Sequence, residues 1–82
     1  MLATIEGKVL AVTEVERGNY QGVEVVLMVG REPVVVESQR DKAPDVGEGE
    51  EVALTCDIRP QFGRLQVRYV RQATVSDAGP SY

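Results

Sequence analysis

Residues 23–37, with the sequence VEVVLMVGREPVVVE, decide the predicted fold of this chain. Between residues 23 and 29 every second side chain is Val or Leu, which is the period of a strand with one buried face. Residues 30–33 form a tight connection, and Pro33 suits the first position of a strand because it donates no ladder hydrogen bond. A short strand over residues 34–37 follows. The stretch therefore predicts two neighbouring strands joined by a hairpin.

Three more strands are predicted around this hairpin. A long one covers about residues 4–15, with Gly7 near its start to let it bend, and a polar hairpin loop with two glycines follows at residues 16–22. Two others, at residues 51–58 and 64–71, are separated by a turn at residues 59–63. All three alternate apolar and polar side chains, so the whole pattern is that of a β domain.

Residues 38–50 break this pattern. They contain one proline, two glycines and many charges, and they show no apolar stripe of helical period. Such a composition disfavours a long helix. We therefore expect a loop, which acts either as a plain connection or as a flap over a binding face.

Five strands, a long bent first strand and a gap between the third and fourth predict an all-β fold. The expected architecture is a five-stranded Greek-key barrel of the oligonucleotide-binding (OB) type that lacks the usual helix. An SH3-like barrel has a similar strand count and is the alternative. We expect the barrel to occupy residues 1–75, and residues 76–82 to form a disordered tail.

The composition argues against several function classes. The chain has one cysteine and no histidine, so it predicts no disulfide framework and no metal site, and Cys56 is expected to be a core thiol. No nucleophile stands beside an activating base, so we expect neither an enzyme nor a cofactor. No stretch approaches the roughly 20 apolar residues of a membrane span. We expect a cytoplasmic protein of a bacterial or phage-host cell, without a membrane partner.

Charge is distributed unevenly along the chain. The net charge of −4 argues at first against a nucleic-acid partner, but residues 41–57 hold six carboxylates and one lysine, whereas residues 58–76 hold four arginines and no carboxylate. A local excess of arginine acts over about one Debye length and predicts a phosphate-facing stripe. The alternative is that these arginines only keep a solvent-facing strand soluble.

Two aromatic residues lie at predicted loop tips. Tyr20 follows Arg17 closely, and Phe62 precedes Arg64. A ring at a loop tip buries little surface within its own chain, so it stacks on a ligand or packs into a partner subunit. Base stacking contributes about 1–3 kcal/mol per base in single-strand binding. Tyr69 falls on the inward face of its strand and is expected in the core. The candidate nucleic-acid-binding residues are Arg17, Tyr20, Phe62, Arg64, Arg68 and Arg71.

Three short segments give the chain a resemblance to a known family. They are Gln61-Phe62-Gly63-Arg64-Leu65, Glu32-Pro33-Val34-Val35-Val36 and Gln21-Gly22. In order and spacing they resemble the hairpin turn, third strand and first binding loop of the single-stranded-DNA-binding proteins of filamentous phages, the gene-five family. The match covers roughly residues 15–72.

The resemblance implies an OB barrel without the usual helix, a two-fold homodimer and cooperative coating of single-stranded DNA. It implies that Phe62 reaches the DNA site of the partner subunit, and Arg71 falls where the family's last strand carries an arginine. The chain departs from the family at its first binding loop, where Tyr20, Val23 and Val25 replace basic and aromatic residues. It departs again at Tyr69, which replaces an arginine that contacts DNA.

These observations lead to one functional expectation and one alternative. We expect sequence-independent binding of single-stranded DNA by a homodimer, serving strand protection or helix destabilisation in phage or plasmid replication. The alternative is a small β-barrel protein-interaction module with no nucleic-acid ligand. In that case the acidic residues 41–51 would contact a basic partner.

Overall fold

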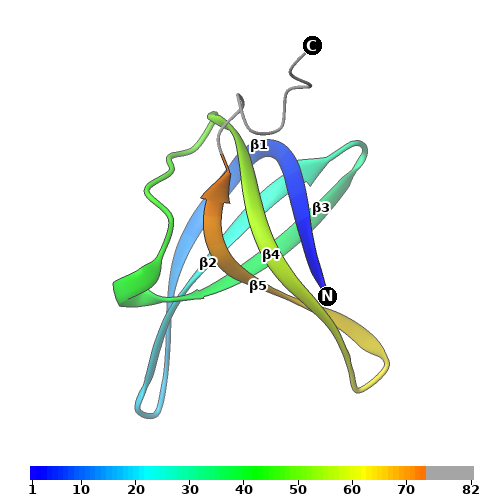
Figure 1. Cartoon of the computed structure of the whole chain (residues 1–82). Helices are drawn as coiled ribbons and strands as arrows, with labels where there is room; N and C mark the ends of the chain where they lie inside the picture. The colour runs from blue at the N-terminus through cyan, green and yellow to red at the C-terminus, as the bar shows by residue number, and fades with distance from the viewer. Residues whose placement is uncertain (74–82) are drawn as a thin grey trace.

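A computed structural model describes residues 1–73 and shows five strands closed into a barrel (Figure 1). Neighbouring strands follow the order β1-β2-β3-β5-β4, and β4 returns to β1. This is an OB-like barrel, so the predicted fold class is confirmed. The predicted tail lies outside the described residues. The strands are β1 (Leu2–Arg17), β2 (Tyr20–Val29), β3 (Glu32–Gln39), β4 (Glu51–Gln61) and β5 (Arg64–Ala73).

The long first strand serves two sides of the barrel, as expected. Residues 2–8 pair with β4 and residues 8–17 pair with β2. Gly7 lies at the bend, where an added Cβ would overlap the carbonyl oxygen of Met28. A glycine is therefore required there by the close approach of β2.

A β-bulge at Leu10 interrupts the register between β1 and β2. Val9 pairs with Leu27, but the next registered pair is Ala11 with Val26. Leu10 is therefore the extra residue of β1, and Val12 pairs with the buried Val25 while remaining 40% exposed itself. The expected period of two nevertheless continues across the bulge, because Val9 is buried and Ala11 half-buried while Leu10 and Val12 are exposed. Such bulges arise from pairing between strands and leave no clear mark in one strand's own sequence.

The hairpins are longer and their turns tighter than the sequence predicted. Residues 16–22 and 59–63 were expected to be loops, yet most of them continue the ladders, and the turns are only Gly18-Asn19 and Phe62-Gly63. The β1–β2 and β4–β5 hairpins consequently extend from the barrel as two separate arms (Figure 1). Apart from Gly22, residues 16–22 and 59–63 are exposed on both faces, so the apolar alternation that marks a half-buried strand is missing there.

The core is small and aliphatic. Cys56 belongs to it, as expected, and burial raises the pKa of its thiol to about 11. At neutral pH the thiol therefore stays protonated and unreactive. Tyr69 is half-buried and packs against the same cluster. The fully buried side chains are Val9, Val25, Leu27, Val36, Leu54 and Cys56.

The segment between β3 and β4 is an anchored connection. It contains one short 3₁₀ turn, Arg40–Lys42, and no longer helix. Ala43 and Val46 then pack against the core. Val9 exchanges backbone hydrogen bonds of 2.8 Å with Glu50 and Gly49. These contacts favour the plain connection over the flap. No helix within residues 1–73 has the length and apolar character needed to cross a bilayer.

Candidate nucleic-acid interface

Three hollows lie one after another along β3. Every second β3 residue from Val35 to Gln39 lines at least one of them. Counted from Val35 toward Gln39, the first and second hollows share Glu37 in their lining, and the second and third share Gln39. The hollows therefore form a continuous path between the two hairpin arms. In OB folds the surface of strands 2 and 3, with the loops joining strands 1–2 and 4–5, is where oligonucleotides and oligosaccharides bind.

The first hollow, which we name the hairpin groove, has a volume of about 530 Å³. It brings together the β1–β2 arm, the outer surface of β2 and β3, and the β4–β5 arm. Three of the predicted site residues line it. Its lining includes Arg17, Glu24, Glu37, Phe62 and Arg64.

Phe62 stands at the tip of the β4–β5 arm with 95% of its surface exposed. Its φ of 50° is the only positive value at a non-glycine position among the described residues, and Gly63 follows at 80°. Positive φ at both central positions is the geometry of a type I′ hairpin turn, which normally takes Asn-Gly or Asp-Gly. A bulky residue there costs about 1–2 kcal/mol. The chain therefore holds an exposed ring in a strained position, which is typical of a functional residue.

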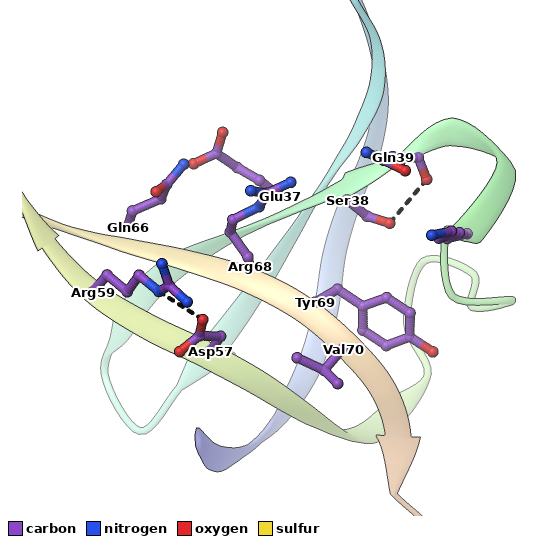
Figure 2. Close-up of a pocket in the computed structure, with 10 residues that line it drawn as sticks. Glu37, Ser38, Gln39, Asp57, Arg59, Gln66, Arg68, Tyr69 and Val70 are labelled. Carbon is purple, nitrogen blue, oxygen red and sulfur yellow. Dashed lines mark hydrogen bonds and ion pairs between the residues drawn. The ribbon is translucent and has the colours of Figure 1, made fainter. Parts of the chain in front are cut away.

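The second hollow, the central hollow, encloses about 320 Å³ where β3 meets β5. Within the described residues these two strands join at one register pair, Glu37 with Arg68. Figure 2 shows Arg68 beside Glu37, with Asp57 and Arg59 nearby on β4. Asp57 is also the register partner of Arg68. Arg68 thus lies between two carboxylates, which reduces the local positive charge around it.

Asp57 is held by two cations. The Met1 ammonium donates a hydrogen bond of 2.9 Å to Oδ1, and Nε of Arg59 donates one of 2.8 Å to Oδ2. The ammonium hydrogen bond first, and then Arg59, hold the pKa of this carboxyl below its usual value. The sequence interpretation found no carboxylate within residues 58–76 to partner these arginines. The fold corrects this for two of the four arginines, because Asp57 pairs with Arg59 on β4, and Asp57 and Glu37 are the register partners of Arg68.

The third hollow, the Tyr20 hollow, has a volume of about 430 Å³ and lies between the β1–β2 arm and the 3₁₀ turn. Tyr20 lines it, and its hydroxyl donates to the Ser38 carbonyl at 3.4 Å. Arg40 lines it too, but its guanidinium contacts Glu14 at 3.0 Å and Glu16 at 4.0 Å. Tyr20 therefore offers a fixed ring with a partly exposed surface, while the charge of Arg40 is already compensated.

Basic residues are concentrated on this path. Six of the nine Lys and Arg side chains line the three hollows, but only four of the thirteen carboxyls do. The path is therefore net positive on a chain whose total charge is −4. Within residues 1–73, four of these six make no ion pair. These four unpaired cations are Arg17, Lys42, Arg64 and Arg68.

The structure places five of the six predicted site residues on this path and one elsewhere. Arg17, Phe62 and Arg64 share the hairpin groove, whereas Arg68 and Tyr20 line the two other hollows. Arg71 lines none of the three. A bulge in β5 pairs Tyr69 with Cys56 and Arg71 with Thr55, which leaves Val70 as the extra residue.

Sequence reasoning missed other residues of the path. Lys42 and Arg59 line the central hollow. Arg59 had a visible signal, since it belongs to the same arginine-rich segment as Arg64. Lys42 had none, because it lies in a segment whose position depends on how the connection folds back on the core. Glu24 and Glu37 belong to predicted strands but were not among the candidate site residues.

The chemistry available on this path is that of ionic contact, hydrogen bonding and stacking. The described residues contain no group of three or more His, Cys, Asp or Glu side chains placed to hold a metal ion. Comparison with family models, with curated proteins and with solved structures found no match to this chain.

Proposed function

We propose that this protein binds single-stranded DNA without a defined recognition sequence. The observation that carries the proposal is the coincidence of two features on one surface. The face that OB folds use for oligonucleotides also holds six of the nine basic side chains and the exposed ring of Phe62. Single-strand binding combines a cationic groove with aromatic platforms, and this path supplies both.

The division of roles follows from position. Arg17 and Arg64 flank the hairpin groove and would contact phosphates, with Arg68 and Lys42 continuing the contacts along the central hollow. Phe62 would stack on a base at one end of the path, and Tyr20 would stack on another at the opposite end. Direct readout of a sequence would need a fixed set of paired donors and acceptors. Stacking and ionic contacts accept any base.

The resemblance to the filamentous-phage family supports two further parts of the proposal. The protein would act as a homodimer, with Phe62 reaching the DNA site of the partner subunit. It would protect or open strands during phage or plasmid replication in the cytoplasm of a bacterial or phage-host cell. Light scattering tests the first part, because a protein that remains a 9.0 kDa monomer at binding concentrations contradicts the dimer.

The test of binding itself is fluorescence anisotropy with a labelled oligo-dT, repeated between about 50 and 200 mM salt. Each neutralised phosphate contributes a slope of about 0.7 in the log–log plot for single strands, so four unpaired cations give a slope of about 3 per chain. A weaker affinity at higher salt with such a slope supports the proposal. Absence of binding at the lowest salt rejects it and leaves the protein-interaction module as the remaining hypothesis.

A further inference from the structure

Two carboxylates face each other inside the hairpin groove. Glu24 on β2 is the direct register partner of Glu37 on β3, and both side chains line the groove and are half-buried. Within residues 1–73 neither carboxylate accepts a hydrogen bond or forms an ion pair. Like charges directly opposite each other on adjacent strands destabilise a sheet. A local conflict of this kind is expected where a residue serves function.

The surrounding charges determine how a nucleic-acid strand can enter this groove. Arg17 and Arg64 lie on the two hairpin arms, whereas the two glutamates lie on the strands between them. Phosphates are attracted to the arginines and repelled by the glutamates. A bound strand therefore runs its backbone along the arms and turns its bases toward β2 and β3. Phe62, on the same groove, is placed to stack on one of these bases.

An ionised carboxylate only accepts hydrogen bonds. Cytosine presents the N4 amino group as a donor, whereas thymine presents the O4 oxygen, an acceptor, at the corresponding position. The glutamates can thus accept a hydrogen bond from the N4 amino group of cytosine, whereas the O4 oxygen of thymine repels them.

We propose that Glu24 and Glu37 accept hydrogen bonds from the exocyclic amino groups of bases in the groove, an inference that rests on the proposed function. The protein then binds cytosine-rich single strands more tightly than thymine-rich ones. This is a preference in base composition and needs no ordered recognition sequence.

The experiment compares labelled oligo-dC and oligo-dT of about 12 nucleotides, a length within the OB-fold range, by anisotropy at mildly alkaline pH, where cytosine is not protonated. Both are pyrimidine strands of equal charge, so the ratio of their affinities compares the two base edges, and the change of this ratio in a variant without the two carboxylates assigns the difference to the glutamates. The full-length protein is measured beside E24Q/E37Q. The charge-matched control is E32Q/E51Q, which changes two exposed glutamates outside the three hollows.

We expect the unmodified protein to favour oligo-dC by about 5-fold or more, the lower end for a base-specific pair. E24Q/E37Q should bring the ratio close to one and bind oligo-dT more tightly, because the repulsion is removed. E32Q/E51Q should strengthen both affinities slightly and keep the ratio. E24Q/E37Q should unfold at an equal or higher temperature, which excludes a folding defect.

Three outcomes overturn the inference and differ in what they mean. Equal, measurable affinities for oligo-dC and oligo-dT reject the role of the glutamates and leave the proposed function intact. A preference for oligo-dC that E24Q/E37Q retains assigns the discrimination to other residues. Failure to bind either strand at low salt rejects the proposed function, and the inference with it.

Discussion

The ring of Tyr20 lies directly on Gly22, two residues along the same strand. A Cβ built on Gly22 would overlap the hydroxyl and two ring carbons of Tyr20. Gly22 is buried beneath it, and the Tyr20 hydroxyl donates to Ser38 on β3. Because Gly22 has no side chain, the Tyr20 ring can pack directly against the backbone of the β1–β2 arm.

Gly22→Ala should displace Tyr20 and destabilise the fold by about 1–3 kcal/mol, the usual range for overpacking. The test is a double-mutant cycle by urea unfolding. In a Tyr20→Ala background the added methyl group meets no ring, so its cost should largely vanish, with a coupling energy on the order of 1 kcal/mol or more. A Gly22→Ala cost that is the same in both backgrounds would show that the ring does not depend on the glycine.

Phe62→Asn should separate stability from binding. Asparagine adopts positive φ readily and forms good type I′ turns with a following glycine, so we expect a gain of up to about 1 kcal/mol in the free energy of unfolding. Loss of the ring should weaken single-strand binding by about 1–3 kcal/mol, the contribution of one stacked base. Thermal unfolding and oligo-dT anisotropy measure the two effects.

The opposite result for Phe62→Asn is informative. A protein that loses stability and keeps its DNA affinity would assign Phe62 to packing, either within the chain or in a dimer. Light scattering on the same variant distinguishes these two kinds of packing, because only loss of a dimer interface lowers the molecular mass.

Arg64 and Arg71 form a matched pair for testing the path. Both are exposed arginines of β5, but only Arg64 lines one of the three hollows. Arg64→Gln should lower the salt slope of oligo-dT binding by about 0.7, the effect of one phosphate contact. Arg71→Gln should leave the slope unchanged. An equal decrease of the salt slope in both variants would mean that the DNA also crosses the barrel beyond the central hollow.

Stability should fall at acidic pH partly through Asp57. Folding lowers the pKa of this carboxyl, chiefly because the Met1 ammonium and then Arg59 donate hydrogen bonds to it. Its contribution is therefore complete above the unfolded-state pKa of about 3.9 and is lost as the pH falls through the lower folded-state pKa. Asp57→Asn lacks this contribution at every pH.

Urea unfolding of the 82-residue chain and of Asp57→Asn, measured from neutral pH down to about pH 2, tests this linkage. The difference in unfolding free energy between the two proteins should be largest at neutral pH and should shrink below about pH 4. A difference that does not change with pH would show that the two hydrogen bonds do not persist in solution.

The fold could be predicted from the sequence because most of its strands show an alternation of apolar and polar residues. The alternation in residues 23–29 reflects burial of one strand face, and Val23, Val25 and Leu27 are indeed buried. In residues 51–58 the inward residues Leu54 and Cys56 are buried as expected, but Ala53 and Thr55, expected to face outward, are buried too. The ends of the strands could not be predicted as well. Tyr20 and Gln61 belong to exposed arms, where no buried face imposes a period of two and ladder hydrogen bonds alone continue the strand.

The candidate site could be predicted from the sequence only in part. Loop tips and arginine-rich segments are visible in a single stretch of sequence, and they indicate Arg17, Phe62 and Arg64. Whether such residues meet depends on pairing between strands. The bulges at Leu10 and Val70 each shift a register by one residue, and neither has a signature in the sequence.

The sequence by itself determined a five-stranded β domain, its aliphatic core and an uneven distribution of charge, because each follows from local alternation or composition. Only the tertiary structure decided that Arg17 and Arg64 share a groove while Arg71 lies outside it, and that Glu24 lies opposite Glu37. The physical reason is that barrel closure and strand register set the distances between residues far apart in the chain. Neither is encoded in any single segment.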